Sequence, residues 1–231
     1  MTKLSKKVEV IALSYDFSQI VHYFPFFIPA AWMTVKITIL GIVIGLGIGF
    51  PVAFGKISKL KSLSSLAKIY IGLIRGTPLL LQIFVVYFGL VHIVSLKPFP
   101  SAALALGVHN GAYIAEIIRG AIQSIDKGQM EAARALGMSH FRAMWRIILP
   151  QAMRRSLPPL GNQFIIALKD SSLASTITIR ELVLTSRQLA SSNYRMMEML
   201  TIAAIFYLLL TGILTGVVNR LEKRLAAGGT R

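Results

Sequence analysis

The stretch from Glu131 to Pro150 reads EAARALGMSHFRAMWRIILP and lies between two long apolar segments. Its first part, 131–136, is rich in helix-forming residues, and Gly137 suits the left-handed conformation that ends many helices. A second run, 141–149, has helical spacing and should stop at Pro150, which lacks the N–H needed to continue it. The sequence therefore predicts a helix–turn–helix elbow that is too polar to lie in lipid. An ordinary amphipathic loop between two spans is the alternative, because charge runs usually form solvated faces.

The spacing within this stretch is more specific than its composition. Glu-Ala-Ala is followed by three residues, a glycine, nine residues, an isoleucine, one residue and Leu-Pro. This pattern resembles the EAA loop of the integral-membrane subunits of bacterial binding-protein-dependent ABC importers. The matching positions are Glu131, Ala132, Ala133, Gly137, Ile147, Leu149 and Pro150. The resemblance implies the type I ABC importer permease fold, which is all-α with five transmembrane helices. It also implies that this loop is cytoplasmic and docks as a coupling helix into a groove on a separate ATPase subunit.

The side chains of the elbow indicate how it would transmit movement from an ATPase subunit to the membrane helices. Glu131 can stabilise the first turn of its helix or pair with Arg134 at i+3. The small Ala132 and Ala133 permit close approach to a partner surface, and Gly137 sets the bend. Replacement of Gly137 by aspartate is therefore expected to abolish transport while leaving insertion of the subunit intact.

Composition independently indicates a membrane protein. The 231 residues are 55% hydrophobic and 15% charged, with a mean hydropathy of +0.66, which is unusual for a soluble domain. The net charge of +16 comes from bases that lie in short loops between apolar runs, which indicates membrane topology rather than nucleic-acid binding. Because the chain has no cysteine, disulfides, thiolate metal sites and cysteine nucleophiles are excluded.

Several apolar segments reach the roughly 20 residues that cross about 30 Å of hydrocarbon. We predict one transmembrane domain over residues 26–225, preceded by a tail or amphipathic segment (1–25) and followed by a short tail (226–231). The predicted spans are 26–54, 69–94, 101–118, 157–179 and 199–218, with the coupling loop at 119–156. A cleaved signal peptide is not expected, because the charged N-terminal region lacks a clean apolar core and a small-residue cleavage site.

The first predicted span carries Gly41, Gly45 and Gly49, which share one face because they recur every four residues. Such a seam of small residues predicts close contact with another helix. The run that ends at Lys56 is a near miss for a phosphate-binding loop. It has one residue too many between its glycines, and Ile57 stands where Ser or Thr should bind magnesium.

Polar residues interrupt the second and third spans. The run 75–78, Arg-Gly-Thr-Pro, must kink the second span or free backbone carbonyls. Glu116 in the third span is expected to pair with Arg119 or Arg75, and His109 to pack between helices. The runs RGTPLLLQ and NGAYIAEIIRGAI also resemble segments of the polar-amino-acid permeases within the same importer family. For the kink, a purely structural role is the alternative.

The fourth span is the least hydrophobic, and Pro158-Pro159 suits its start. Lys169 and Asp170 follow about 12 residues later, or ~18 Å at 1.5 Å per residue, near the middle of the bilayer. A charge there costs about 2.5–3.5 kcal/mol, so such residues normally face a bundle interior or an aqueous path. Asn162 shares a helix face with Lys169, and Gln163 shares one with Asp170. The KDSS run resembles amino-acid permeases with different substrates, so Asp170 does not by itself select arginine.

These depths define a candidate substrate path near mid-membrane. Its residues are Thr77, Gln82, Asn110, Asn162, Lys169, Asp170 and Ser171. The two charged side chains could supply opposite signs for the carboxylate and ammonium groups of an amino acid. Hydrogen bonds between helices and an interhelical ion pair are the alternatives at each position.

Five spans place the chain ends on opposite sides of the membrane. The side that bears the elbow carries 15 lysines and arginines in its loops and tail, and the other side carries 7. The positive-inside rule therefore places the elbow and the C-terminus in the cytoplasm and the N-terminus outside. The expected location is the bacterial cytoplasmic (inner) membrane. The three N-terminal lysines do not follow the positive-inside rule, because they lie on the side that is predicted to be outside.

The sequence offers no catalytic constellation, so the chain is expected to be a non-catalytic permease subunit without a cofactor of its own. The resemblance implies an ABC ATPase subunit that binds ATP and Mg²⁺, a second permease subunit (identical or paralogous), and an extracytoplasmic substrate-binding protein. A polar or basic amino acid is the expected substrate, and membrane lipid the expected surroundings. Alternatives are an ABC permease for methionine, a peptide or an anion, an ion-coupled secondary transporter or channel, and a membrane scaffold that transports nothing.

Overall fold

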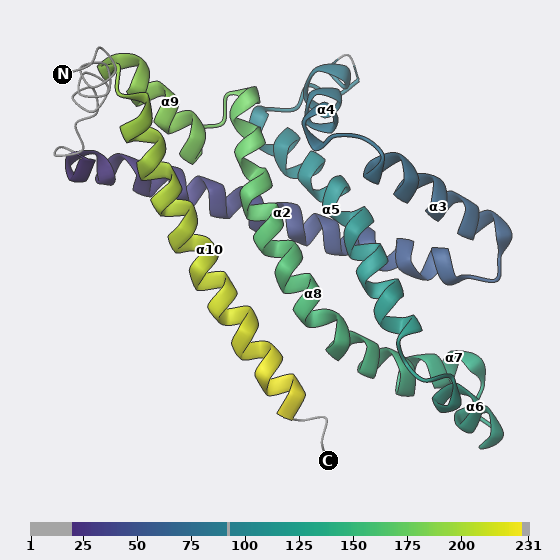
Figure 1. Cartoon of the computed structure of the whole chain (residues 1–231). Helices are drawn as coiled ribbons and strands as arrows, with labels where there is room; N and C mark the ends of the chain where they lie inside the picture. Colours follow the sequence, from purple (N-terminus) through teal and green to yellow (C-terminus); the bar gives the residue numbers. More distant parts are fainter. Residues whose placement is uncertain (1–19, 92, 228–231) are drawn as a thin grey trace, which may run out of the picture.

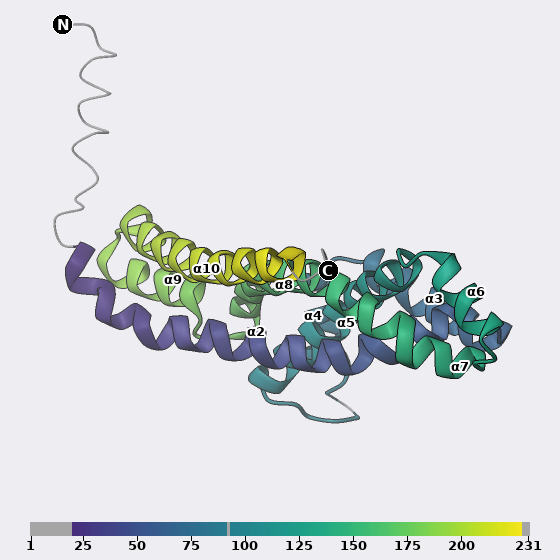
Figure 2. The same cartoon turned by 90° about the horizontal axis from the view of Figure 1, so that it is seen from below.

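The computed structural model describes residues 20–91 and 93–227. The helices in this part of the chain form a flat bundle, broad in Figure 1, where α2 passes behind α8 and α5, and thin in Figure 2, where α2 and α10 lie on opposite faces. The helices are α2 (Ile20–Ile57), α3 (Lys61–Arg75), α4 (Leu79–Phe84), α5 (Pro98–Gln123), α6 (Lys127–Ala135), α7 (His140–Ala143), α8 (Leu149–Asp170), α9 (Leu182–Asn193) and α10 (Met196–Ala227). The predicted N-terminal tail or amphipathic segment lies outside the described residues up to residue 19, and residues 20–25 form the first turns of α2.

The close pairing of α2 with α5 holds the centre of the bundle. A Cβ atom added to Gly49 would lie 2.6 Å from Cγ2 of Ile114, and one added to Gly45 would lie 3.1 Å from Cβ of Asn110. No side chain larger than hydrogen fits at such distances without movement. The predicted glycine seam is therefore confirmed, and its partner is α5, which supplies Gly107 and Gly111 from its own side.

The second predicted span is broken. Its two halves, Lys61–Arg75 and Leu79–Gly89, meet at an angle of 103°. The break falls at Gly76, Thr77 and Pro78, since proline removes a backbone donor and its ring collides with the preceding turn. The hydroxyl of Thr77 donates to the Leu73 carbonyl at 2.8 Å, which partly satisfies the freed backbone.

The start of α8 differs from the start that was predicted for the fourth span. Pro158 and Pro159 lie inside α8, which begins at Leu149, rather than at a helix start. The segment that precedes the prolines is amphipathic, and Leu149, Ala152 and Ser156 are buried against the rest of the bundle. Tertiary packing of this face offsets the cost of the prolines, as it supplies most helical stability in proteins.

A further helix lies between the fourth and the fifth predicted spans. After α8 the chain makes a 3₁₀ segment (Ser171–Ile177) and then forms α9. The side chain of Glu181 caps α9 by accepting hydrogen bonds from the Val183 and Leu184 amides. Figure 1 places α9 beyond one end of α8, and α6 and α7 beyond the other. The elbow and α9 therefore lie at opposite ends of the bundle.

Among the described residues, two helices are long and apolar enough to cross a membrane, namely Ile20–Ile57 and Met196–Leu225, or three if the bent pair counts as one span. Length and composition alone thus do not establish the predicted count of five. Among the other long helices, α5 is largely enclosed by the bundle and buries the polar side chains of Asn110 and His109. A helix covered by other helices has little need of a lipid-compatible surface.

Candidate functional site: the elbow and the polar centre

The predicted elbow is present and consists of α6, a turn and α7. The carboxylate of Asp126 caps α6 by accepting from the Gly128 amide at 2.7 Å. At the other end Gly137 has φ +80°, and the Met138 amide donates to the Ala133 carbonyl at 3.1 Å. The Gly137 amide donates to the Arg134 carbonyl at 3.0 Å. This pair of bonds is the Schellman arrangement, which requires a left-handed residue at the position of the glycine.

Two details of the elbow differ from the prediction. The helix begins at Lys127, so Glu131 lies beyond its first turn, where its charge contributes little to the helix dipole. The Arg134 guanidinium donates to the Met138 carbonyl at 2.9 Å, and no Glu131–Arg134 ion pair is present in the described part of the chain.

The second helical run also does not stop at Pro150. A π-helical segment, Met144–Ile148, links α7 directly to α8, and the proline lies in the first turn of α8. Proline has no N–H and so leaves one carbonyl of the preceding turn without its helical partner, yet the backbone continues as helix through this position. The elbow is therefore joined to α8 by continuous helical backbone, which allows a displacement of the elbow to pass into the membrane helices.

The signature residues divide into two groups by exposure. Exposed positions are Glu131, Ala132, Gly137 and Pro150, while Ala133 and Leu149 are buried and Ile147 is half-buried. The buried members fasten the elbow to the bundle, and the exposed members form an outer surface. Next to them Leu136 is 85% exposed. The signature does not include this residue, although its place just before the glycine marks it as the tip of the elbow.

The predicted substrate-path residues form three separate groups in the structure. In the first, the amide nitrogen of Gln82 donates to the Thr77 hydroxyl at 2.9 Å, and its oxygen contacts Nδ1 of His109 at 3.0 Å. In the second, Gln163 donates to the side-chain oxygen of Asn110 at 2.8 Å, which joins α8 to α5. Two residues that the candidate set omitted, His109 and Gln163, are therefore hydrogen-bonded to members of that set.

The third group lies where α8 ends. Asn162 and Lys169 are exposed, Asp170 is half-buried, and Ser171 is buried with its hydroxyl bonded to the Leu168 carbonyl at 2.7 Å. The shared face of Asn162 and Lys169 is therefore an outer face of this protomer. Among the described residues, no hydrogen bond or ion pair joins this group to the other two.

A cluster of ions lies near the ends of α2, α3 and α5. Glu116 accepts from Lys56 at 2.5 Å and from Arg119 at 3.0 Å, and Arg75 lies 3.9 Å from it. The expected pairing of Glu116 with Arg119 and Arg75 is confirmed, and Lys56 is an additional partner. The guanidinium of Arg75 also lies 5.1 Å from the centre of the Tyr113 ring. This cluster ties three helices together because one carboxylate is shared among cations from each of them.

The protein family follows from the similarity of this chain to known proteins. Residues 41–227 match the family described as the binding-protein-dependent transport system inner membrane component. The chain belongs to that family. It is therefore a permease component of an ABC transport system, as the elbow signature predicted.

Individual relatives of this permease are similar over nearly their whole length. The glutamine transport system permease protein GlnP of Escherichia coli (strain K12) is 39% identical over 216 residues, which covers 92% of this chain and 99% of that protein. The nopaline transport system permease protein NocM of Agrobacterium fabrum (strain C58 / ATCC 33970) is 38% identical over 232 residues, covering 93% and 96%. A crystal structure of an amino acid ABC transporter with histidines matches with a TM-score of 0.87 at 40% identity, covering 91% of this chain and 99% of that one.

Proposed function

We propose that this permease subunit forms half of the translocation path of an ATP-driven importer for a polar or basic amino acid. The observation that carries the proposal is the elbow, whose signature residues present an exposed surface while a π-helical segment joins it to α8. The amino-acid class is supported by the relatives, since GlnP is named for glutamine transport and NocM for nopaline transport.

In this proposal the elbow is cytoplasmic and docks on a separate ATPase subunit, which binds ATP and Mg²⁺. The chain itself hydrolyses nothing. Two permease subunits, identical or paralogous, assemble with two ATPases, and an extracytoplasmic binding protein delivers the solute. The topology is five spans with the N-terminus outside and the C-terminus in the cytoplasm, supported by the excess of lysine and arginine on the elbow side.

The proposed substrate path includes the three polar groups at Thr77 and Gln82, at Asn110, and at the end of α8. Lys169 is the member best placed for an interface with the second permease subunit, because it is exposed at a depth where lipid would be costly. Asp170 is proposed to bind the ammonium group of the substrate. Unchanged substrate affinity in an Asp170→Asn variant would remove this residue from the site.

The experiment that tests the function begins with isolation of the permease from solubilised native membranes. The co-purifying proteins are identified, and ATP hydrolysis is measured with the binding protein and a panel of twenty amino acids. A co-purifying ATPase stimulated by one polar amino acid is the expected result. Stimulation only by a peptide or an anion would refute the amino-acid assignment while leaving the importer assignment intact.

A further inference from the structure

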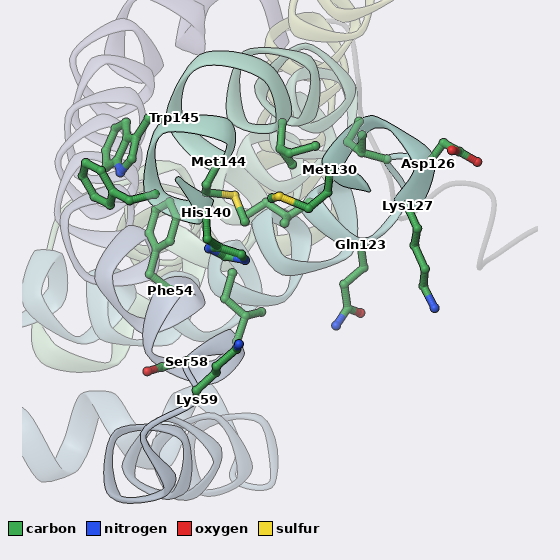
Figure 3. A pocket seen from close by; sticks show the side chains of 15 residues that line it. Phe54, Ser58, Lys59, Gln123, Asp126, Lys127, Met130, His140, Met144 and Trp145 are labelled. Atoms are coloured by element: carbon green, nitrogen blue, oxygen red, sulfur yellow. The ribbon is translucent and has the colours of Figure 1, made fainter. Parts of the chain in front are cut away.

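A large open cavity lies beside the elbow and has no place in the function proposed so far. Its volume is about 1060 Å³, comparable to a small-molecule site, and three segments of chain form its walls. These are the end of α2, the junction of α5 with α6, and the run from α7 into the π-helical segment (Figure 3). The apolar part of the wall includes Phe54, Ile122, Met130, Met144 and Trp145.

Aromatic rings pack against one another in the wall of the cavity. The rings of Phe54 and Trp145 stack with their centres 6.0 Å apart and an interplanar angle of 13°. Phe141 lies against Trp145 at 5.9 Å. Phe141 and Trp145 are nevertheless 71% and 51% exposed. These exposed rings beside the cavity are available for contact with a group that occupies it.

Two lysines contribute positive charge to the cavity. Lys59 and Lys127 line it and are exposed. The one acidic residue among the lining residues, Asp126, caps α6 and keeps its negative charge, so the lining has two lysines against one carboxylate. The occupant that complements this lining therefore combines an apolar group with neighbouring negative charge.

The place of the cavity favours a protein as the occupant. The run from α7 forms one wall and the start of α6, with Lys127 and Met130, contributes to another, so the cavity lies next to the surface that the proposed function assigns to the ATPase. Met130 and Met144 face one another in the wall (Figure 3). Methionines adapt their shape to an inserted side chain and are frequent at surfaces that grip a partner.

We propose that this cavity receives an apolar side chain of the ATPase subunit that is flanked by acidic residues. The inference rests on the proposed function and deepens it. The elbow tip at Leu136 docks on the ATPase, while the ATPase in turn inserts a side chain between the elbow and the ends of α2 and α5. Because the inserted group is held between these parts, the ATPase can both push and pull the elbow.

The chain lacks cysteine, so single thiols can be placed as probes. Met144→Cys reports on the cavity, Leu136→Cys on the elbow tip, and Lys223→Cys near the end of α10 serves as a control. Maleimide labelling rates are measured for the permease in detergent, in nanodiscs with anionic lipid, and in the assembled complex with its ATPase. The expected result is that ATPase slows labelling of both Met144→Cys and Leu136→Cys at least tenfold, with no change at Lys223→Cys.

The other outcomes overturn the inference in distinguishable ways. Protection of Leu136→Cys but not of Met144→Cys by the ATPase leaves the proposed function standing and refutes the inserted side chain. Protection of Met144→Cys in nanodiscs without ATPase identifies lipid as the occupant, and protection already in detergent identifies a second copy of this chain. If the ATPase neither associates nor protects either thiol, the proposed function itself fails.

A second experiment identifies the inserted group. A photo-activatable residue in place of Met130 is expected to cross-link, in the assembled complex, to an ATPase peptide with an apolar residue next to a carboxylate. A cross-linked peptide that is basic would contradict the proposal.

In parallel, the double variant Lys59→Glu/Lys127→Glu should weaken ATPase association at least tenfold at low salt, whereas Lys223→Glu should not change it. Equal association of both variants would also overturn the proposal.

Discussion

Alanine in place of Gly137 should weaken the coupling between ATP hydrolysis and uptake. Gly137 has φ +80°, and a Cβ at this position would meet no heavy atom within 4 Å, so the cost of the change lies in the backbone alone. The left-handed conformation costs an L-residue about 1–2 kcal/mol. An energy of that size favours other conformations of the turn by roughly 5- to 30-fold. The orientation of the exposed tip residue Leu136 would then no longer be fixed.

Asparagine is the matched control at this position, because its short polar side chain tolerates the left-handed conformation. In proteoliposomes that contain the whole importer, the amino acid taken up per ATP hydrolysed should fall in the order glycine, asparagine, alanine. Gly137→Asp adds a charge to the docking surface and should abolish transport while the subunit still inserts. Uptake by the alanine variant equal to that of the wild type, or normal uptake by the aspartate variant, would refute the reasoning.

Three further predictions concern the bundle. Gly49→Ala should lower the free energy of unfolding by about 1–3 kcal/mol, because its Cβ would lie 2.6 Å from a neighbouring side chain. Gly47→Ala is the control and should not destabilise the protein, because a Cβ there would meet no atom within 4 Å; thermal unfolding in detergent measures both variants. A double-mutant cycle with Asn110→Ala and Gln163→Ala should give a coupling of about 0.6–1.7 kcal/mol, and a value near zero would mean that their hydrogen bond contributes nothing. Glu181 lies outside the predicted spans, and its burial raises the pKa of its carboxyl group, although the amides that it caps and the Tyr207 hydroxyl oppose the shift. Because the folded state then binds the proton more tightly, stability should fall as pH rises from about 4.3 through the raised pKa, and Glu181→Gln should remove this dependence.

Parts of this architecture follow from local rules and could be predicted from the sequence. The glycine seam of α2 could be predicted because four-residue spacing places small residues on one helix face. The bend at Gly137 and the break at Pro78 depend on the backbone of single residues. Glu116 could be matched with Arg119 because they lie three residues apart on one helix.

Other parts depend on packing between distant segments, which no local pattern records. The helix α8 runs through Pro158 because its preceding turns bury an apolar face, and propensity alone predicts a start there. Gln163 escaped the candidate set because its partner, Asn110, lies 53 residues away. The cavity beside the elbow escaped for the same reason, since its walls come from three segments that meet only in the folded chain.

The most direct test of the account is accumulation of a polar amino acid by proteoliposomes that contain this permease, its ATPase and the binding protein. The account predicts uptake that requires ATP and persists when ionophores collapse all ion gradients. A homo-oligomer of this chain that lacks an ATPase and takes up solute only with an ion gradient would contradict it.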